Sequence, residues 1–406
     1  MRSIQRVLGV FVAAVAAVAV IALAATGVAV ASPGHHGNRH FPPPHHIPQP
    51  PHHFPPPPHH FPPPPAPEAG VFVQTDNSAG NSIVAYRRNA DGTLTEAGTY
   101  STGGLGGQLE GSVVDHLASQ GSLSLDPQDH LLYAVNAGSN TISEFAVNGT
   151  HLQLLQVVPS GGEFPVSITT HGNLVYVLNA RGGGSIQGYL QVAGHLVPIA
   201  AWNRPLGLDP TATPEFTHTP GQIAFTPSGS QLVVTTKGNT SSVDVFGLDG
   251  FGRPSPTPTV TPLPGTVPFA VDFDAAGQLL IAEAGTNAVA SFTVGAEGSL
   301  TDVTSVATGQ QATCWIAGAG PYLYASNAGS GSVSGFLDGP GTLTPLGNTA
   351  THGGTVDATA TGRFLYVQTG AEGIVDEFQI EAGGSLSPLG SVTVPGAVGG
   401  EGIVAS

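Results

Sequence analysis

The sequence predicts an all-β fold, a seven-bladed β-propeller with four-stranded blades, and three observations lead to this prediction. A short apolar strand recurs seven times between Phe72 and Tyr366. The segments around each recurrence alternate apolar and polar residues and are rich in β-branched side chains, which is typical of strands. The chain also ends in a spare strand that the first repeat lacks, so the ring can close on itself.

The seven recurring strands start 42 to 61 residues apart, a spacing typical of one propeller blade per repeat. Each is followed by a turn rich in Gly, Asn or Ser and then by two further strands. Each except the first is preceded by a short strand of small residues. The recurring strands lie at residues 72–75, 133–136, 176–179, 234–237, 281–284, 324–327 and 366–369.

The last six residues, 401–406, follow the seventh complete repeat and read as one more strand. The first repeat is the one without an inner strand. We therefore expect the C-terminal strand to complete the first blade, with Ile403 beside the strand of Phe72. Such pairing removes the open sheet edges that an unclosed array would expose.

The N-terminus has the layout of a secretory signal peptide. Arg2 and Arg6 precede a long run, 7–30, that is apolar except for Thr26 and ends in a small-residue pattern at Ala31. We predict a signal peptide at residues 1–31, a secreted protein, and no stable membrane insertion after cleavage. The run is long enough to span a bilayer, so an uncleaved anchor is the alternative.

Residues 32–67 form a predicted disordered spacer rich in His and Pro, which separates the leader from a propeller at residues 68–406. Between residues 33 and 67 lie 16 of the 36 prolines and nine of the 16 histidines. Proline runs favour extended polyproline II structure and build no core. The paired imidazoles of His52, His53, His59 and His60 are candidate ligands for a loosely bound divalent metal. The sequence suggests no other cofactor. The alternative is a solubilising stalk.

Charge and cysteine content exclude several classes of function. The chain has 10 Lys and Arg against 26 Asp and Glu, a net charge of −16, and Lys237 is its sole lysine. Nucleic acids are therefore excluded as partners, because they require basic patches. Cys314 is the single cysteine, so no internal disulfide forms, and its place on an inner strand predicts a buried side chain. We expect a monomer.

Two runs resemble the blade signature of the lactonase-like propellers. They are Tyr-Ala-Val-Asn-Ala-Gly-Ser-Asn-Thr-Ile at 133–142 and Tyr-Ala-Ser-Asn-Ala-Gly-Ser-Gly-Ser-Val at 324–333. That family includes propeller-type 6-phosphogluconolactonases, carboxymuconate lactonising enzymes and surface-layer repeats with a Tyr-Val-Thr-Asn motif. The resemblance covers residues 70–406 and implies the seven-bladed fold and chemistry on lactones.

The catalytic residues that the resemblance implies do not match this chain. The family's enzymes carry an Arg-His pair and a further His at the starts of inner strands, and a Glu after a second strand. The inner-strand starts at 163–166, 219–222, 267–270 and 312–315 contain neither Arg nor His, although His218 directly precedes one of them. Catalytic roles therefore cannot be transferred residue by residue.

The longest loops point to a candidate ligand site. Two connections between an outer strand and the next inner strand, 103–116 and 202–218, are longer than the others, and binding residues gather on such loops. Loops between second and third strands reach the same face. Together they predict a site for a small anionic or carbonyl-bearing ligand that contains Glu163, Arg181, Arg204, Glu215, His218 and Lys237. His218 or Glu215 is the candidate general base. The alternative is that these charges brace the loops.

We expect an extracellular ligand-binding or interaction module, whose partner is a small ligand or a cell-surface component. The first alternative is a lactonase or lactonising enzyme that acts on a sugar-acid or muconate-type lactone. The second is a structural protein of the cell wall. The unmatched catalytic residues favour the binding module.

Overall fold

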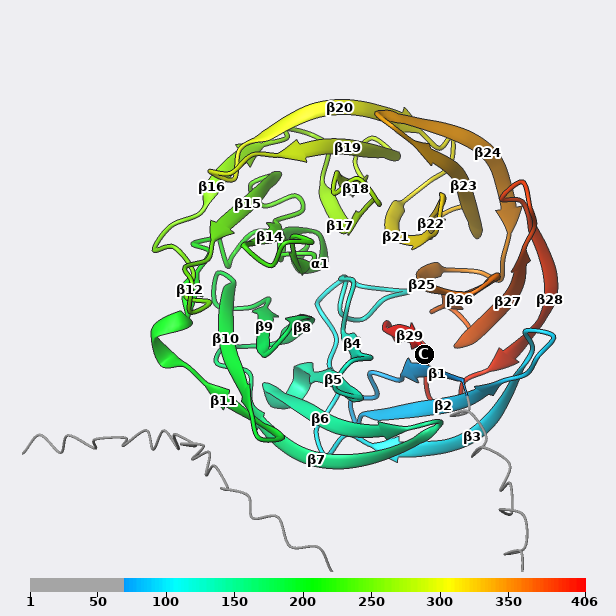
Figure 1. Ribbon diagram of the computed structural model, residues 1–406, viewed down its shortest axis with the longest axis horizontal. Coiled ribbons are helices and arrows are strands. Elements are labelled where there is room, and N and C mark those ends of the chain that lie inside the picture. The colour runs from blue at the N-terminus through cyan, green and yellow to red at the C-terminus, as the bar shows by residue number, and fades with distance from the viewer. Residues whose placement is uncertain (1–68) are drawn as a thin grey trace, which may run out of the picture. The chain divides into compact units, whose positions relative to one another are not determined.

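The computed structural model describes residues 69–406, which form a ring of seven antiparallel sheets (Figure 1). The predicted seven-bladed β-propeller is confirmed. The predicted leader at 1–31 and the spacer at 32–67 lie outside the described residues. Within residues 69–406 no helix is long and apolar enough to cross a membrane.

The first four blades are built as follows, from the inner strand outward. Blade 1 contains β29 (Ile403–Ala405), β1 (Gly70–Gln74), β2 (Ser82–Arg88) and β3 (Leu94–Ser101). Blade 2 contains β4 (Leu123–Asp126), β5 (Leu131–Asn136), β6 (Thr141–Asn148) and β7 (His151–Pro159). Blade 3 contains β8 (Pro165–His171), β9 (Leu174–Asn179), β10 (Ser185–Val192) and β11 (His195–Pro198). Blade 4 contains β13 (Ile223–Phe225), β14 (Gln231–Thr235), β15 (Ser242–Gly247) and β16 (Thr259–Pro262).

The remaining three blades repeat the same order. Blade 5 contains β17 (Pro268–Phe273), β18 (Leu279–Glu283), β19 (Ala288–Val294) and β20 (Leu300–Ala307). Blade 6 contains β21 (Thr313–Ala319), β22 (Tyr322–Asn327), β23 (Ser332–Gly339) and β24 (Thr342–Ala350). Blade 7 contains β25 (Thr355–Thr361), β26 (Phe364–Thr369), β27 (Ile374–Ile380) and β28 (Leu386–Thr393).

Short helical turns occur only in connections within the described chain. One 3₁₀ turn, η1 (Ala137–Ser139), follows β5. The connection from blade 3 to blade 4 contains η2 (Ala200–Trp202), the two-residue strand β12 (Arg204–Pro205), which pairs with β10, and the single helical turn α1 (Glu215–His218). The long connection predicted from the sequence therefore carries its own local structure.

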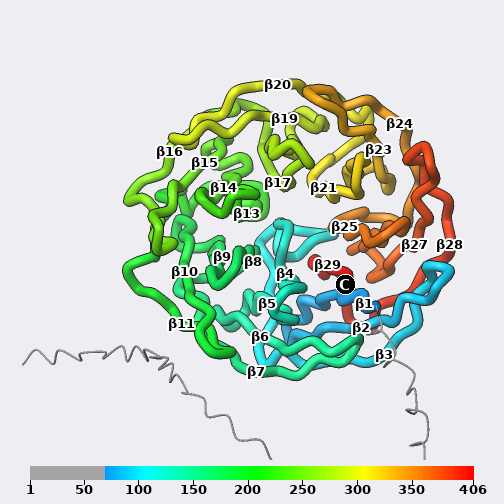
Figure 2. Tube along the Cα trace, viewed as in Figure 1, coloured from blue at the N-terminus to red at the C-terminus, as the bar shows by residue number. Residues whose placement is uncertain are grey.

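The C-terminal strand closes the ring, as the sequence predicted. β29 pairs antiparallel with β1, and Ile403 lies opposite Val73 while Val404 lies opposite Phe72. Figure 2 shows the red end of the chain beside its blue first strand. Ile403 is buried with the apolar side chains of blades 1 and 7. The first blade therefore contains the two ends of the described chain.

Tyrosines on the second strands of blades 3, 6 and 7 form hydrogen bonds to the next blade. Tyr176 in blade 3 donates its hydroxyl hydrogen to the Gly252 carbonyl of blade 4 at 2.6 Å. Tyr366 in blade 7 reaches the Gly92 carbonyl of blade 1 at 2.8 Å. Tyr324 makes the equivalent bond from blade 6 to blade 7 at 2.8 Å. The recurring tyrosine thus fills the interface between blades and satisfies its own hydroxyl.

Strand connections of two kinds meet on one face of the ring, which we call the loop face. They are the connections from an outer strand to the next inner strand, and the loops from the second strand to the third. The two long connections, 102–122 and 199–222, both belong to this face. The residues that were predicted from the sequence to bind a ligand therefore belong to the loop face.

Deletion of residues 401–406 tests ring closure. The deletion removes the buried Ile403 and the backbone ladder of β29, so we expect a loss of unfolding free energy of about 4 kcal/mol or more. Urea unfolding measures it. Phe251→Ala is the control, because this side chain is 85% exposed and its loss should cost less than about 0.5 kcal/mol. Equal stability of the two variants would contradict closure by β29.

Candidate functional site

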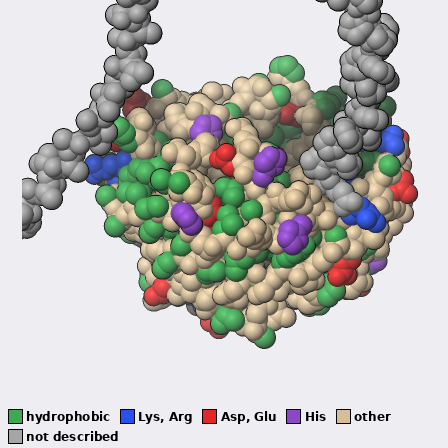
Figure 3. All heavy atoms as spheres, turned by 60° about the horizontal axis from the view of Figure 1, so that its bottom comes forward, with side chains coloured by type: hydrophobic (Ala, Val, Ile, Leu, Met, Phe, Trp, Pro, Cys, Tyr) green, Lys and Arg blue, Asp and Glu red, His purple; other side chains and the backbone are tan. Residues whose placement is uncertain are grey.

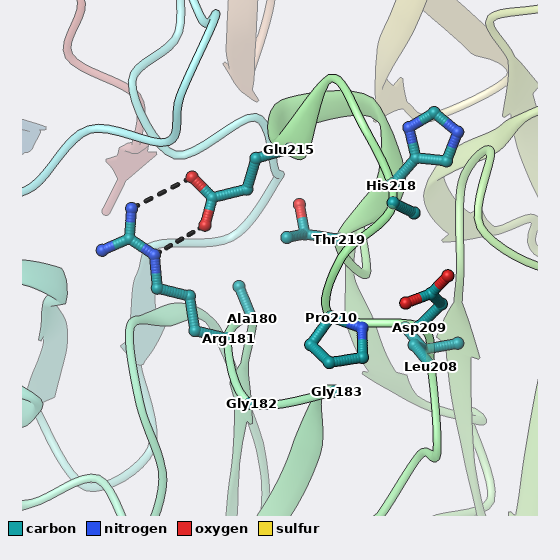
Figure 4. A pocket seen from close by; sticks show the side chains of 11 residues that line it. Ala180, Arg181, Gly182, Gly183, Leu208, Asp209, Pro210, Glu215, His218 and Thr219 are labelled. Carbon is teal, nitrogen blue, oxygen red and sulfur yellow. Dashed lines mark hydrogen bonds and ion pairs between the residues drawn. The ribbon is translucent and has the colours of Figure 1, made fainter.

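A small cavity on the loop face lies between blades 3 and 4 (Figure 4). Its volume is about 40 Å³, which is room for one small polar group. Arg181, Asp209, Glu215 and His218 supply its ionisable side chains, and Gly182 and Gly183 form part of its floor. Three of the six predicted ligand residues, Arg181, Glu215 and His218, therefore meet at one cavity.

Arg181 and Glu215 form an ion pair at one side of this cavity. Arg181 Nε donates to Glu215 Oε1 at 2.6 Å, and Nη2 donates to Oε2 at 3.0 Å. The bond from Arg181 lowers the pKa of Glu215. The guanidinium also lies over the Phe164 ring, 4.3 Å from its centroid. Glu215 is therefore held as a carboxylate and is a poor general base.

The same ion pair fastens the connection between blades 1 and 2. Glu215 Oε2 accepts a bond from the Glu110 backbone amide at 2.7 Å, and Arg181 Nη2 donates to the Gln108 carbonyl at 3.3 Å. Glu163 lies next to Arg181 in space through a backbone bond, yet it does not line the cavity. Arg181 and Glu215 therefore hold the loops together, which is the alternative role that the sequence suggested for these charges.

His218 is the cavity residue with an uncommitted ring atom. Its Nδ1 lies 2.9 Å from the Pro214 carbonyl and 2.9 Å from Thr217 Oγ1. The carbonyl contact requires a proton on Nδ1, which leaves Nε2 as an acceptor in the neutral ring. Figure 4 shows the ring turned away from the Arg181–Glu215 pair and on the same side as Asp209. His218 and Asp209 are the groups that can meet a ligand.

Lys237 is not a surface ligand group, and this part of the prediction is wrong. The residue is 1% exposed, and its Nζ donates to the Ala118 carbonyl, the Phe216 carbonyl and Thr219 Oγ1 at 2.6, 2.6 and 3.0 Å. An ammonium group has three protons, so all of them are used. Burial lowers the pKa of Lys237, and the nearby carboxylate of Asp115 opposes the shift. The sole lysine is a structural clamp.

Arg204 is also absent from the cavity. Its guanidinium donates to the carbonyls of Ser255 and Pro254 in blade 4, at 2.8 and 2.7 Å, and to those of Ala201 and Asn203, at 2.9 and 2.7 Å. These bonds tie β12 to the neighbouring blade. The predicted ligand role of Arg204 is therefore replaced by a bracing role.

The connection at residues 103–121, which we call the central segment, crosses the middle of the ring. Figure 1 shows it in cyan between β4 and β25. It reaches blade 6, where Trp315 Nε1 donates to the Ser119 carbonyl at 2.7 Å. Gln120 exchanges two bonds with the backbone of Ile316, at 2.7 and 3.0 Å. The predicted binding loop therefore joins opposite sides of the propeller.

Asp115 organises the turn inside the central segment. Its carboxylate accepts the backbone amides of Leu117, Ala118 and Ser119 at 2.8, 2.8 and 2.9 Å. Burial raises the pKa of Asp115, while these amides and Lys237 oppose the rise. Asp115 therefore fixes the conformation of this turn.

Three more buried carboxyl groups surround the start of the closing strand. Asp76 Oδ2 accepts the Glu401 amide at 2.8 Å, and Asp357 Oδ2 accepts the Ile403 amide at 3.2 Å. Glu401 is 0% exposed, and its Oε1 accepts the Gly121 amide at 2.9 Å. Burial raises the pKa of Asp76 to about 7 and also raises those of Asp357 and Glu401. The closing strand is thus held by carboxyl groups from blades 1 and 7.

No group of side chains in the described part of the chain has the arrangement of a metal site. The predicted metal ligands His52, His53, His59 and His60 lie outside the described residues. Cys314 is buried as expected, and burial raises the pKa of its thiol to about 12. It is therefore an unreactive thiol.

Residues 77–187 match a family model described as Lactonase, 7-bladed beta-propeller. The resemblance to the lactonase-like seven-bladed propellers is confirmed. No curated protein matches the sequence of this lactonase-like propeller.

Solved structures show the same fold at low sequence identity. The periplasmic gluconolactonase PpgL of Pseudomonas aeruginosa has a TM-score of 0.66 and 19% identity over 83% of this chain and 98% of its own. A protein from Bacteroides fragilis, provisionally assigned as a 6-phosphogluconolactonase, has a TM-score of 0.66 and 21% identity over 84% of this chain and 97% of its own. A protein from Lactobacillus plantarum has a TM-score of 0.65 and 21% identity over 84% and 100%.

The buried carboxyl groups at the centre of this lactonase-like propeller were not predicted from the sequence. Asp76 lies in the first repeat, Asp357 in the seventh and Glu401 just before the closing strand, so no local motif marks them. The available signal was the position of Glu401 at the start of the predicted closing strand. A second signal was the presence of a single lysine in a chain with little other positive charge.

The Asp76 carboxyl group predicts a pH-dependent stability. Its folded pKa of about 7 exceeds the ordinary value of 3.8, so its contribution is present below pH 3.8 and is lost as the pH rises through 7. Relative to Asp76→Asn, the wild type should lose about 4 kcal/mol of unfolding free energy between pH 4 and pH 8. Asn tolerates the positive φ of 51° at this position.

Denaturant unfolding at several pH values measures this difference. Asp91→Asn is the control, because the exposed Asp91 has a lowered pKa. The difference between the wild type and that variant should therefore change in the opposite direction. Parallel stability curves for the wild type and Asp76→Asn would refute the assignment.

Proposed function

We propose that this lactonase-like propeller is an extracellular module that binds a small anionic or carbonyl-bearing ligand at the cavity of Figure 4. The proposal rests on which charged side chains of the loop face already have internal hydrogen-bond partners and which do not. Lys237, Arg204 and the Arg181–Glu215 pair are committed to internal bonds. At the cavity, Asp209 Oδ1 accepts bonds from Thr211 and His218 Nδ1 contacts the Pro214 carbonyl, whereas Asp209 Oδ2 and His218 Nε2 have no hydrogen-bond partner among the described residues. These two atoms are the ones available for a ligand.

The dimensions of the cavity limit what enters it. A volume of about 40 Å³ accepts one carboxylate or hydroxymethyl group and leaves the rest of the ligand outside. Protonated His218 suits an anionic group, and the Asp209 carboxylate accepts bonds from hydroxyls. A polyhydroxylated acid such as gluconate combines both groups. The predicted leader and spacer support an extracellular setting for such binding.

Gluconate binding tests the proposal. We expect chemical-shift changes at His218 on titration with gluconate, and His218→Ala should weaken binding by about tenfold through loss of one charge-assisted hydrogen bond. His195→Ala is the control, since His195 is exposed at the start of β11 in the outer strand of blade 3. Equal binding by both variants would place the ligand elsewhere, and absence of any ligand effect would favour a purely structural protein.

Lactone hydrolysis is the second candidate, and two observations favour it. The similar structures include a gluconolactonase, and His218 Nε2 can accept a proton from water. Water would attack the lactone carbonyl and the ring C–O bond would break, giving a hydroxy acid. Against this, Glu215 is held by Arg181, and the central segment occupies the middle of the ring.

A turnover assay separates the two candidates. We expect the purified protein to hydrolyse glucono-δ-lactone no faster than buffer alone, because a cavity of about 40 Å³ is too small to enclose a lactone ring. Proton release in weakly buffered solution measures the rate. Accelerated hydrolysis that disappears in His218→Ala and persists in His195→Ala would establish the enzyme and reject the binding-only proposal.

A further inference from the structure

Two arginines converge on one aromatic ring on the face opposite the loop face. Arg88 ends β2 in blade 1, and Arg363 lies in the turn between β25 and β26 of blade 7. Their guanidinium carbons lie 5.7 and 5.4 Å from the centroid of the Phe364 ring. We call this group the arginine pair. It lies at the seam between the first and last blades, far along the strands from the cavity of Figure 4.

The seam holds the arginine pair on a rigid base. Phe364 is 4% exposed, and the turn at Gly92 packs against its ring. Gly92 has a φ of +91°, and any β-carbon there would collide with Phe364. Leu94 donates its amide hydrogen to Glu377 across the seam at 2.9 Å. The position of the ring is therefore fixed by both blades.

The arginine pair has no internal counter-ion among the described residues. The two ion pairs found there are Arg181–Glu215 and His352–Asp376. Arg88 Nε is buried and has no hydrogen-bond acceptor. Of the neighbouring carboxylates, Asp91 accepts the Thr93 hydroxyl at 2.7 Å and Glu377 accepts the Leu94 amide at 2.9 Å, and neither forms an ion pair with an arginine. A buried donor without a partner is costly, which makes this position exceptional.

Two positive groups near one ring repel each other, and the ring face offsets only part of that repulsion. The chain is strongly acidic, with a net charge of −16, and could easily supply a carboxylate at this position. Lys and Arg side chains are sparse on the surface shown in Figure 3. No ion pair among residues 69–406 neutralises the arginine pair, so its two positive charges are available to an anion.

We propose that the arginine pair is a binding site for a phosphate group. A doubly charged tetrahedral oxyanion neutralises two guanidinium groups and accepts several of their hydrogens. The exposed Arg363 provides access from solvent, and the half-buried Arg88 provides the fixed partner. The site is independent of the proposed function at the loop face. Its source of phosphate is a free ion or a phosphate-bearing polymer, which share this chemistry.

Arg87 gives a matched control for this proposal. It is adjacent to Arg88 in β2, and successive strand residues point to opposite faces of the sheet. Tyr86 and Val84 pack into the seam with blade 7, whereas Ala85 and Ile83 pack toward blade 2. Arg87 therefore points away from Phe364 while it carries the same charge at almost the same place in the chain.

Calorimetric titration of the full chain with inorganic phosphate and with polyphosphate, at matched ionic strength, tests the site. We expect Arg88→Gln and Arg363→Gln each to weaken phosphate binding by about tenfold, and Arg87→Gln to leave it within about twofold. If polyphosphate binds more tightly than the free ion and shows the same pattern, a polymer is the source. If both bind alike, the free ion is the source.

Two results would overturn the proposal. One is the absence of phosphate binding by the wild type, and the other is an equal loss in Arg87→Gln, which would indicate unspecific attraction to charge. If Arg88→Gln does not fold, Arg363→Gln decides the outcome, because Arg363 is exposed in a turn. Thermal unfolding in chloride alone checks that each variant retains the fold.

Discussion

The propeller depends on the attachment of its last strand to its first. β29 pairs with β1, and two carboxyl groups from neighbouring elements accept its backbone amides: Asp76 that of Glu401 and Asp357 that of Ile403. Ser122 of blade 2 donates to the Glu401 carbonyl at 2.7 Å. The strand is thus held from three sides. Without it, blade 1 would lose its inner strand and the seam with blade 7 would lose its support.

The centre of the ring is occupied by the central segment and by buried ionisable side chains. The central segment passes between the inner strands, and Asp115, Lys237 and Glu401 are buried with it. Burial of charges is unfavourable unless hydrogen bonds replace water, and each of these groups has such bonds. This network fixes the centre of the propeller. The candidate cavity accordingly lies away from the centre, between blades 3 and 4.

In this molecule the fold does not determine which side chains are available to bind a ligand. The architecture is shared with a gluconolactonase, but a scaffold of this kind carries many activities, and the activity resides in particular side chains. Most positive groups on the loop face serve as braces, as Arg204 does between blades 3 and 4. Arg88 and Arg363, which have no ion-pair partner among the described residues, lie at the opposite face, at the seam that ring closure creates. A charge is informative about function only after its internal partners are known.

The sequence alone determined the architecture, because strand alternation, a repeat every 42 to 61 residues and a spare final strand are local or countable properties. It also brought Arg181, Glu215 and His218 to one face, since loop length and strand order set that face. Only the tertiary structure decided which charges are free. Lys237 and Arg204 looked available because their acceptors, such as Ala118 and Pro254, are backbone carbonyls of distant residues. Every residue has a backbone carbonyl, so the sequence cannot indicate which carbonyls accept these hydrogen bonds. Only the folded structure identifies them.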